Sequence, residues 1–111
     1  MSRITTHVLD TARGRPAAGV PVTLEVRSGD AWRALGRAHT DADGRARDIC
    51  DGDIEVGTYR LTFDTAAYFE KIDVEGFFPV AQIVFDVRDA RQHHHVPLLL
   101  SPFGYSTYRG S

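Results

Sequence analysis

The chain has 111 residues, of which 42% are hydrophobic and 25% are charged, and its formal net charge is -2. This length suits one core, and we expect a single domain over residues 1–111 that binds no membrane, because no apolar run approaches the ~20 residues of a spanning helix. The balance of 13 basic against 15 acidic residues excludes the basic bias of nucleic-acid-binding proteins.

Short strands are predicted along most of the chain by alternating apolar and polar residues, in the order 4–10, 20–27, 32–38, 58–64, 81–87 and 93–100. A hairpin turn is expected at residues 28–30, and a second turn at residues 41–44, where the aspartates can bond to the local backbone and Gly44 tolerates a positive φ. Residues 65–72 begin with an N-cap and contain helix formers, and they predict one short helix. This order favours an all-β, antiparallel sandwich of seven to eight strands with one short helix.

The location of the protein is predicted from two further features. The single cysteine, Cys50, excludes an internal disulfide. The first strand-like segment begins at Ile4, which leaves no room for a signal peptide. We therefore expect a cytoplasmic protein.

The last predicted strand starts with three histidines, His93, His94 and His95. Successive strand residues point to opposite faces, and His94 falls with the apolar residues that follow it at alternate positions. We therefore expect His94 to pack inward, and His93 and His95 to share the opposite face.

Three adjacent histidines raise the question of a metal site. His94 cannot join both of its neighbours on one ion, because its side chain points the other way. His93, His95 and the distant His7 offer ligands of the kind that zinc accepts, but no second pair of closely spaced ligands accompanies them. We expect no metal ion.

Two other polar residues allow opposite interpretations. His7, taken alone, is typical of a surface histidine on an edge strand. Arg45 follows the turn at residues 41–44, where arginine is most often solvated, although its guanidinium also suits an anion or a carbonyl. The sequence contains no nucleophile elbow, phosphate-binding glycine loop or interpretable cysteine–histidine pair.

The end of the chain contains more functional side chains than a terminal segment usually does. Residues 100–111 include three aromatic side chains, an arginine, several hydroxyls and the terminal carboxylate, without one acidic residue. These features, directly after the histidine-bearing strand, predict a tail that docks into a site.

Three segments carry a resemblance to a known family. Residues 6–10 (THVLD) with Gly14-x-Pro16-Ala17, and residues 101–106 (SPFGYS), resemble the N-terminal and C-terminal signatures of the transthyretin-like family. Residues 108–111 (YRGS) are similar to the terminal tetrapeptide of the family's enzymes, the 5-hydroxyisourate hydrolases, as distinct from its hormone carriers. Residues 40–45 match the segment that supplies the arginine of those enzymes. The likeness extends from Ile4 to Ser111.

The resemblance implies one site. Its catalytic residues are His7, Arg45, His95 and Ser111, and its substrate-binding residues are His7, Arg45 and Tyr108. The implied reaction is hydrolysis of 5-hydroxyisourate to 2-oxo-4-hydroxy-4-carboxy-5-ureidoimidazoline in urate catabolism. The histidines would activate and orient water, Arg45 would bind substrate oxygens, and the tail would supply hydrogen bonds. This scheme requires no metal or organic cofactor.

The resemblance also implies an assembly. Members of the family form a homotetramer, a dimer of dimers, with their sites between the dimers. His94 departs from the family, in which this position is usually Tyr or Phe, and we expect a packing change there without loss of chemistry.

Two other functions fit a sandwich of this kind, because a fold does not fix a function. A transthyretin-like carrier would bind an aromatic ligand between dimers without turnover, and a structural module would mediate protein contacts. The joint presence of His7, Arg45, His95 and the tail favours the enzyme, since a carrier has no need to keep them together.

Overall fold

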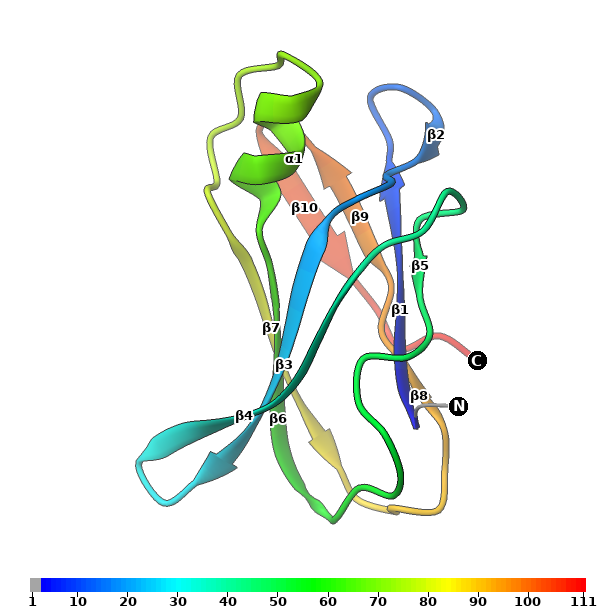
Figure 1. The fold of residues 1–111 in the computed structure, drawn as a ribbon, viewed down its shortest axis with the longest axis vertical. Helices are drawn as coiled ribbons and strands as arrows, with labels where there is room; N and C mark the ends of the chain where they lie inside the picture. The colour runs from blue at the N-terminus through cyan, green and yellow to red at the C-terminus, as the bar shows by residue number, and fades with distance from the viewer. Residues whose placement is uncertain (1–2) are drawn as a thin grey trace.

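The computed structural model describes residues 3–111. Within these residues, two β-sheets pack face to face and one short helix lies at one end of the sandwich (Figure 1). One sheet has the order β4-β3-β6-β7, formed by β3 (Pro21–Ser28), β4 (Ala31–His39), β6 (Gly57–Phe63) and β7 (Ala81–Val87). The other sheet contains β1 (Ile4–Asp10), β2 (Arg15–Pro16), β5 (Arg45–Ala46), β8 (His94–His95), β9 (Leu98–Ser101) and β10 (Gly104–Thr107). The predicted all-β sandwich is confirmed.

The sheet β4-β3-β6-β7 follows the predicted alternation and is antiparallel throughout. Leu24 on β3 and Leu61 and Phe63 on β6 have no exposed surface, whereas the intervening Thr23 and Thr62 are only partly buried. Each fully buried large apolar side chain stabilises the fold by roughly 1.5–3 kcal/mol. This sheet therefore supplies the apolar layer against which the other sheet packs.

β1 departs from the antiparallel expectation. It pairs antiparallel with β2 and β5, but parallel with β8 and β9, so that Thr5 lies opposite His95. The strand predicted over residues 93–100 is interrupted at Pro97, which has no N–H to donate to a ladder. The chain end then adds β10, an unpredicted strand that pairs antiparallel with β9.

α1 (Thr65–Lys71) confirms the helix predicted over residues 65–72. The carboxylate of Asp64 accepts a backbone N–H of the first turn at 3.0 Å and caps the helix. The hydroxyl of Tyr68 donates to the buried carboxylate of Asp10 at 2.7 Å, which ties α1 to the end of β1. Among residues 3–111, no helix is long and apolar enough to cross a membrane.

Candidate active site

A cavity of about 220 Å³ lies where β1, β5 and β8 meet the end of the chain. In Figure 1 these three strands and the C-terminus lie together on the right-hand side of the molecule. The cavity is lined by Thr5, Thr6, Arg45, Arg47, His93, His95 and Ser111. Three of the residues predicted for one site, Arg45, His95 and Ser111, therefore share one cavity.

His95 is held at this cavity by β1. The hydroxyl oxygen of Thr5, which lies opposite His95 in the parallel register, is 2.8 Å from Nδ1 of His95. The same oxygen is 3.0 Å from Nε2 of His93. The rings of His93 and His95 are stacked at an interplanar angle of 18° with centroids 6.4 Å apart. The two histidines share one face, as strand parity predicts.

The surroundings of His95 favour its neutral form. Burial is the largest effect that lowers the pKa of His95 from its ordinary value of 6.5, and the neighbouring Arg45, His93 and His7 lower it further. A neutral imidazole at pH 7 is able to accept a proton from water. His95 therefore has the electrostatic character of a general base.

Arg45 reaches the cavity because a tight turn precedes it. The carboxylate of Asp41 accepts the backbone N–H of Arg45 at 3.0 Å and closes the turn. Gly44 has a φ of 75°, and a β-carbon at this position would clash with the carbonyl oxygen of Val8. The predicted turn at residues 41–44 is confirmed, and Arg45 follows it as the first residue of β5.

His7 lies beside this cavity, opposite Arg45 in the pairing of β1 with β5. His7 is half-buried, and its Nε2 donates to the carbonyl oxygen of Asp43 at 2.9 Å. In the neutral ring, Nδ1 is then the nitrogen that can accept a hydrogen bond. His7 does not line the cavity, but it is close enough to lower the pKa of His95.

The tail returns to His95 after β10. The backbone N–H of Gly110 donates to the carbonyl oxygen of His95 at 2.8 Å, which forms an isolated antiparallel bridge. This contact brings Ser111 to the cavity wall. The tail thus docks at the histidine-bearing strand, as its composition predicts.

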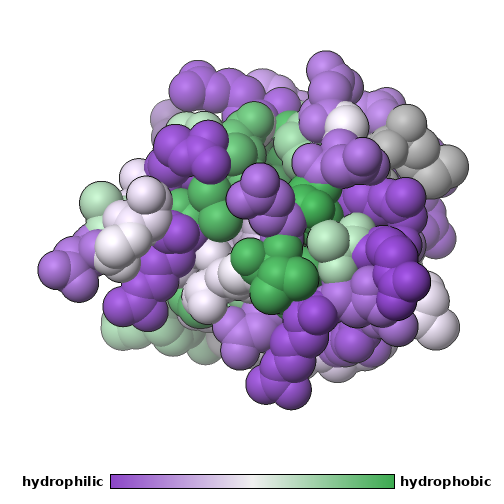
Figure 2. All heavy atoms as spheres, turned by 90° about the horizontal axis from the view of Figure 1, so that it is seen from below, coloured by the Kyte–Doolittle hydropathy of each residue, from purple (hydrophilic) through white to green (hydrophobic). Residues whose placement is uncertain are grey.

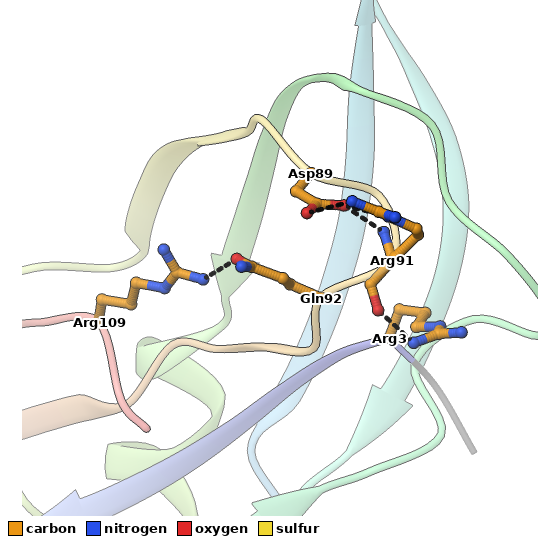
Figure 3. A network of polar contacts seen from close by, with 5 residues as sticks. All are labelled: Arg3, Asp89, Arg91, Gln92 and Arg109. Carbon is orange, nitrogen blue, oxygen red and sulfur yellow. Dashed lines mark hydrogen bonds and ion pairs between the residues drawn. The ribbon is translucent and has the colours of Figure 1, made fainter.

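The loop between β7 and β8 is held from two sides (Figure 3). Nη2 of Arg109 in the tail donates to Oε1 of Gln92 at 3.1 Å, and Arg3 donates to the backbone carbonyl of Arg91 at 2.6 Å. Within the loop, Arg91 pairs with Asp89 at 3.1 Å. Contacts as exposed to solvent as these add little to stability, but together they hold the loop that leads into His93.

Tyr108 lies away from the cavity that contains His95. It borders a different cavity of about 230 Å³ together with His94 and residues of β7. Its side chain is 57% exposed. Within one chain, the fold does not bring Tyr108 to Arg45 and His95.

His94 is buried, as strand parity predicts, with an exposed fraction of 4%. Its Nδ1 has no hydrogen-bond partner among the described residues. Burial, followed by the nearby Arg109 guanidinium, lowers the pKa of His94. His94 is therefore a neutral packing residue with an unsatisfied nitrogen.

Another cavity, of about 210 Å³, lies at the lower end of the sandwich beside the loop that leads into β6. Figure 2 shows this end of the molecule, with apolar side chains gathered in the middle and polar ones around them. The cavity is lined by Val26, Arg33, Leu35, Cys50, Asp51, Asp53, Ile54, Glu55 and Tyr59. None of these is a histidine, the side chain whose ordinary pKa lies closest to pH 7.

Thr5, Thr6, Arg47 and His93 line the first cavity but were not predicted as site residues, although His93 shares strand parity with His95. Thr5 lies on the same strand face as His7, and Arg47 on the same face as Arg45, because alternate strand residues point the same way. This shared face is the sequence signal that could have identified Thr5 and Arg47. No signal marks Thr6, whose hydroxyl donates to the carbonyl oxygen of Val96 at 2.5 Å. Across residues 3–111, no three His, Cys, Asp or Glu side chains gather in a way that could hold a metal ion.

Comparison with known proteins identifies several relatives. A family model described as the HIUase/Transthyretin family matches residues 4–110. A 5-hydroxyisourate hydrolase of Caulobacter vibrioides is 49% identical over 115 residues, and the match covers 100% of both chains. A probable 5-hydroxyisourate hydrolase of Caenorhabditis elegans is 46% identical over 109 residues, covering 97% of this chain and 81% of the relative.

Solved structures of two functional types are similar to this fold. The 5-hydroxyisourate hydrolase of Klebsiella pneumoniae aligns with a TM-score of 0.87 and 39% identity, over 97% of this chain and 98% of that one. Sea bream transthyretin in complex with thyroxine aligns with a TM-score of 0.91 and 31% identity, over 98% of this chain and 95% of that one. The fold therefore does not separate an enzyme from a carrier, and the choice between them depends on the site.

Proposed function

Because the chain belongs to the HIUase/Transthyretin family, we propose that it hydrolyses 5-hydroxyisourate to 2-oxo-4-hydroxy-4-carboxy-5-ureidoimidazoline in urate breakdown. The observation that carries this proposal is the cavity shared by Arg45, His95 and Ser111. These residues come from distant parts of the chain, and they combine a proton acceptor, a fixed cation and a hydroxyl group. The hydrolases of Caulobacter vibrioides and Klebsiella pneumoniae support the assignment.

The reaction opens a ring at a carbonyl–nitrogen bond, and each step has a group suited to it. Neutral His95 accepts a proton from water, and His7 beside it helps to orient that water. The guanidinium of Arg45 binds the substrate's oxygens and stabilises the developing oxyanion. Ser111, through its hydroxyl or carboxylate, orients the neighbouring groups. None of these steps calls for a metal or an organic cofactor.

We further propose a homotetramer, a dimer of dimers, in which the sites lie between dimers. Large apolar side chains exposed on the single chain support association, among them Phe77 at 67% and Phe103 at 67%. β10 and β7 are edge strands, each with one side unpaired within its sheet. Tyr108 as a substrate contact is a prediction for this assembly. Light scattering after size-exclusion chromatography tests the tetramer, and a monomeric mass at micromolar concentration would rule it out.

The direct test of function is a coupled assay on freshly generated 5-hydroxyisourate. We expect the wild-type protein to accelerate its decay, and the variants His7→Ala, Arg45→Ala and His95→Ala to lose most of that activity while remaining folded. Wild-type decay no faster than the spontaneous reaction would refute the proposal, as would full activity in all three folded variants. A carrier would instead show saturable binding of an aromatic ligand without turnover.

A cytoplasmic location and a single domain over residues 1–111 also remain predictions. Cell fractionation checks the first. Limited proteolysis checks the second, because one domain resists cleavage except at its termini and exposed loops.

A further inference from the structure

The hydroxyl of Thr5 lies between two histidine rings. Its oxygen is 2.8 Å from Nδ1 of His95 and 3.0 Å from Nε2 of His93. Thr5 is 6% exposed, and all three residues line the cavity proposed as the active site. The arrangement comes from the parallel pairing of β1 with β8, which sets Thr5 opposite His95.

This geometry couples the protonation of the two rings. A hydroxyl has one proton, so Thr5 donates to only one of the two nitrogens and accepts from the other. If Nδ1 of His95 carries a proton, it donates to Thr5, and Thr5 donates to Nε2 of His93. Nε2 of His95 then holds the lone pair that a general base needs.

We propose that Thr5 and His93 are positioning residues that form a proton relay behind His95, an inference that rests on the proposed hydrolysis. A water proton moves to Nε2 of His95 as the water oxygen bonds to the substrate's carbonyl carbon. The Nδ1 proton of His95 moves to the oxygen of Thr5, and the former hydroxyl proton of Thr5 moves to Nε2 of His93. The same path in reverse returns a proton through His95 to the leaving nitrogen when the carbon–nitrogen bond breaks.

The surroundings of the two histidines set the direction of this transfer. Burial and the guanidinium of Arg45 disfavour a cation on His95, and His7 lies nearby on β1. In the single chain His93 is more exposed than His95, so burial penalises a positive charge on its ring less. A proton that His95 takes from water therefore moves on to His93, where the positive charge is better solvated.

Ring tautomers, measured without substrate, give the first test. Long-range proton–nitrogen spectra of nitrogen-15-labelled protein distinguish Nδ1–H from Nε2–H, and a His95→Gln variant assigns the His95 signals. We expect the proton of His95 to reside on Nδ1 in the wild type and in Thr5→Ser, and to be shared between both nitrogens in Thr5→Val. A wild-type ring protonated at Nε2, or an unchanged tautomer in Thr5→Val, would overturn the relay.

Kinetics give the second test. Thr5→Val and His93→Gln should each lower kcat by about tenfold or more, while KM changes by less than about twofold. Thr5→Ser should restore the rate, and the double variant should be no slower than either single one, because both changes break the same path. Thr62→Val, a strand threonine of the other sheet, is the matched control and should retain full activity.

The two tests separate the relay from the proposed function. An inactive wild type would refute the hydrolysis, while the tautomer of His95 would still report on the relay. Additive losses in the double variant would overturn the relay and leave the hydrolysis intact. If Thr5→Val does not fold, His93→Gln, at an exposed position, carries the kinetic test, and an unchanged kcat in that variant would overturn the relay.

Discussion

Gly110 lies directly against the ring of His95. Its N–H donates to the backbone carbonyl of His95 at 2.8 Å, and a β-carbon added at Gly110 would come within 2.6 Å of Cδ2 of that ring. Real β-carbons almost never approach another atom this closely, so only glycine fits here without displacing the histidine. The tail therefore contacts the site through its backbone as well as through its side chains.

Gly110→Ala should impair activity by moving the His95 ring. A displacement of about 1 Å in a catalytic group is able to cost roughly a hundredfold in rate, and we expect a loss of that order in kcat/KM. Gly104→Ala is the control, because its β-carbon would meet only Oγ of Ser101 at an ordinary 3.8 Å. Equal activity of the two variants in the coupled assay would contradict the close contact.

Arg45→Lys should retain charge but lose the planar fork that binds two oxygens at once. We expect kcat/KM to fall about tenfold in Arg45→Lys, and by about 10²–10³ in Arg45→Ala, which removes an oxyanion-stabilising donor. Arg88→Lys is the control, since the side chain of Arg88 is 88% exposed and pairs with Asp86 at 3.7 Å, away from the first cavity. Wild-type kinetics in Arg45→Lys would show that a single positive charge is sufficient.

His94→Phe should stabilise the protein and leave activity unchanged. The substitution removes a buried nitrogen that has no hydrogen-bond partner among the described residues, and such groups cost about 1–3 kcal/mol. We expect the free energy of unfolding in urea to rise by about 1 kcal/mol, after allowance for imperfect packing of the new ring and for the lost interaction of His94 with the backbone of Gln92. A destabilised variant would indicate that Nδ1 has a partner in the assembled protein.

The stability of the protein should fall as the pH is lowered from 7.5 to 5.5. The pKa values of His94 and His95 are both lowered from 6.5 in the folded state, chiefly by burial. Below about pH 6.5 the unfolded chain therefore binds more protons than the folded chain, and the free energy of unfolding decreases with decreasing pH. Urea titrations across this range measure the slope. His94→Phe should flatten it, and an unchanged slope would contradict the assignment.

Tyr68→Phe should destabilise the fold without touching the site. The hydroxyl of Tyr68 donates to a carboxyl oxygen of Asp10, a residue that is 1% exposed, so its loss leaves a buried polar group with one donor fewer. We expect a loss of about 1–3 kcal/mol in unfolding free energy, measured by urea titration. Tyr105→Phe, at a position that is 38% exposed, should have little effect by comparison.

The sequence predicts most strands because each presents one face to the core and one away from it. Leu24 and Leu61 alternate with partly buried threonines, and that period is visible without a structure. The two-residue strands β2 and β5 are too short to show a period. The parallel pairing of β1 is also invisible, because alternation reports which face a residue occupies and not which strand lies beside it.

The candidate site is predicted to a similar extent. Arg45 and His95 share a cavity, and parity separates His94 from its neighbours correctly. Tyr108 lies elsewhere, because its place depends on how the chain turns after β10, which no pattern in the tail encodes. Thr5 is missed because a strand threonine carries no catalytic motif, and its role depends on a residue 90 positions away.

The parallel register of β1 has a consequence for how the protein folds. Thr5 and His95, 90 positions apart, are among the contacts with the greatest sequence separation in the fold. Such contacts raise the contact order and slow folding, because the intervening chain must be ordered before they form. During synthesis β1 emerges long before β8 and β9. The backbone groups of β1 that pair with these two strands therefore stay unpaired until the end of the chain has been made. Enzymatic activity should therefore be the last property that a refolding chain recovers, after its secondary structure has returned.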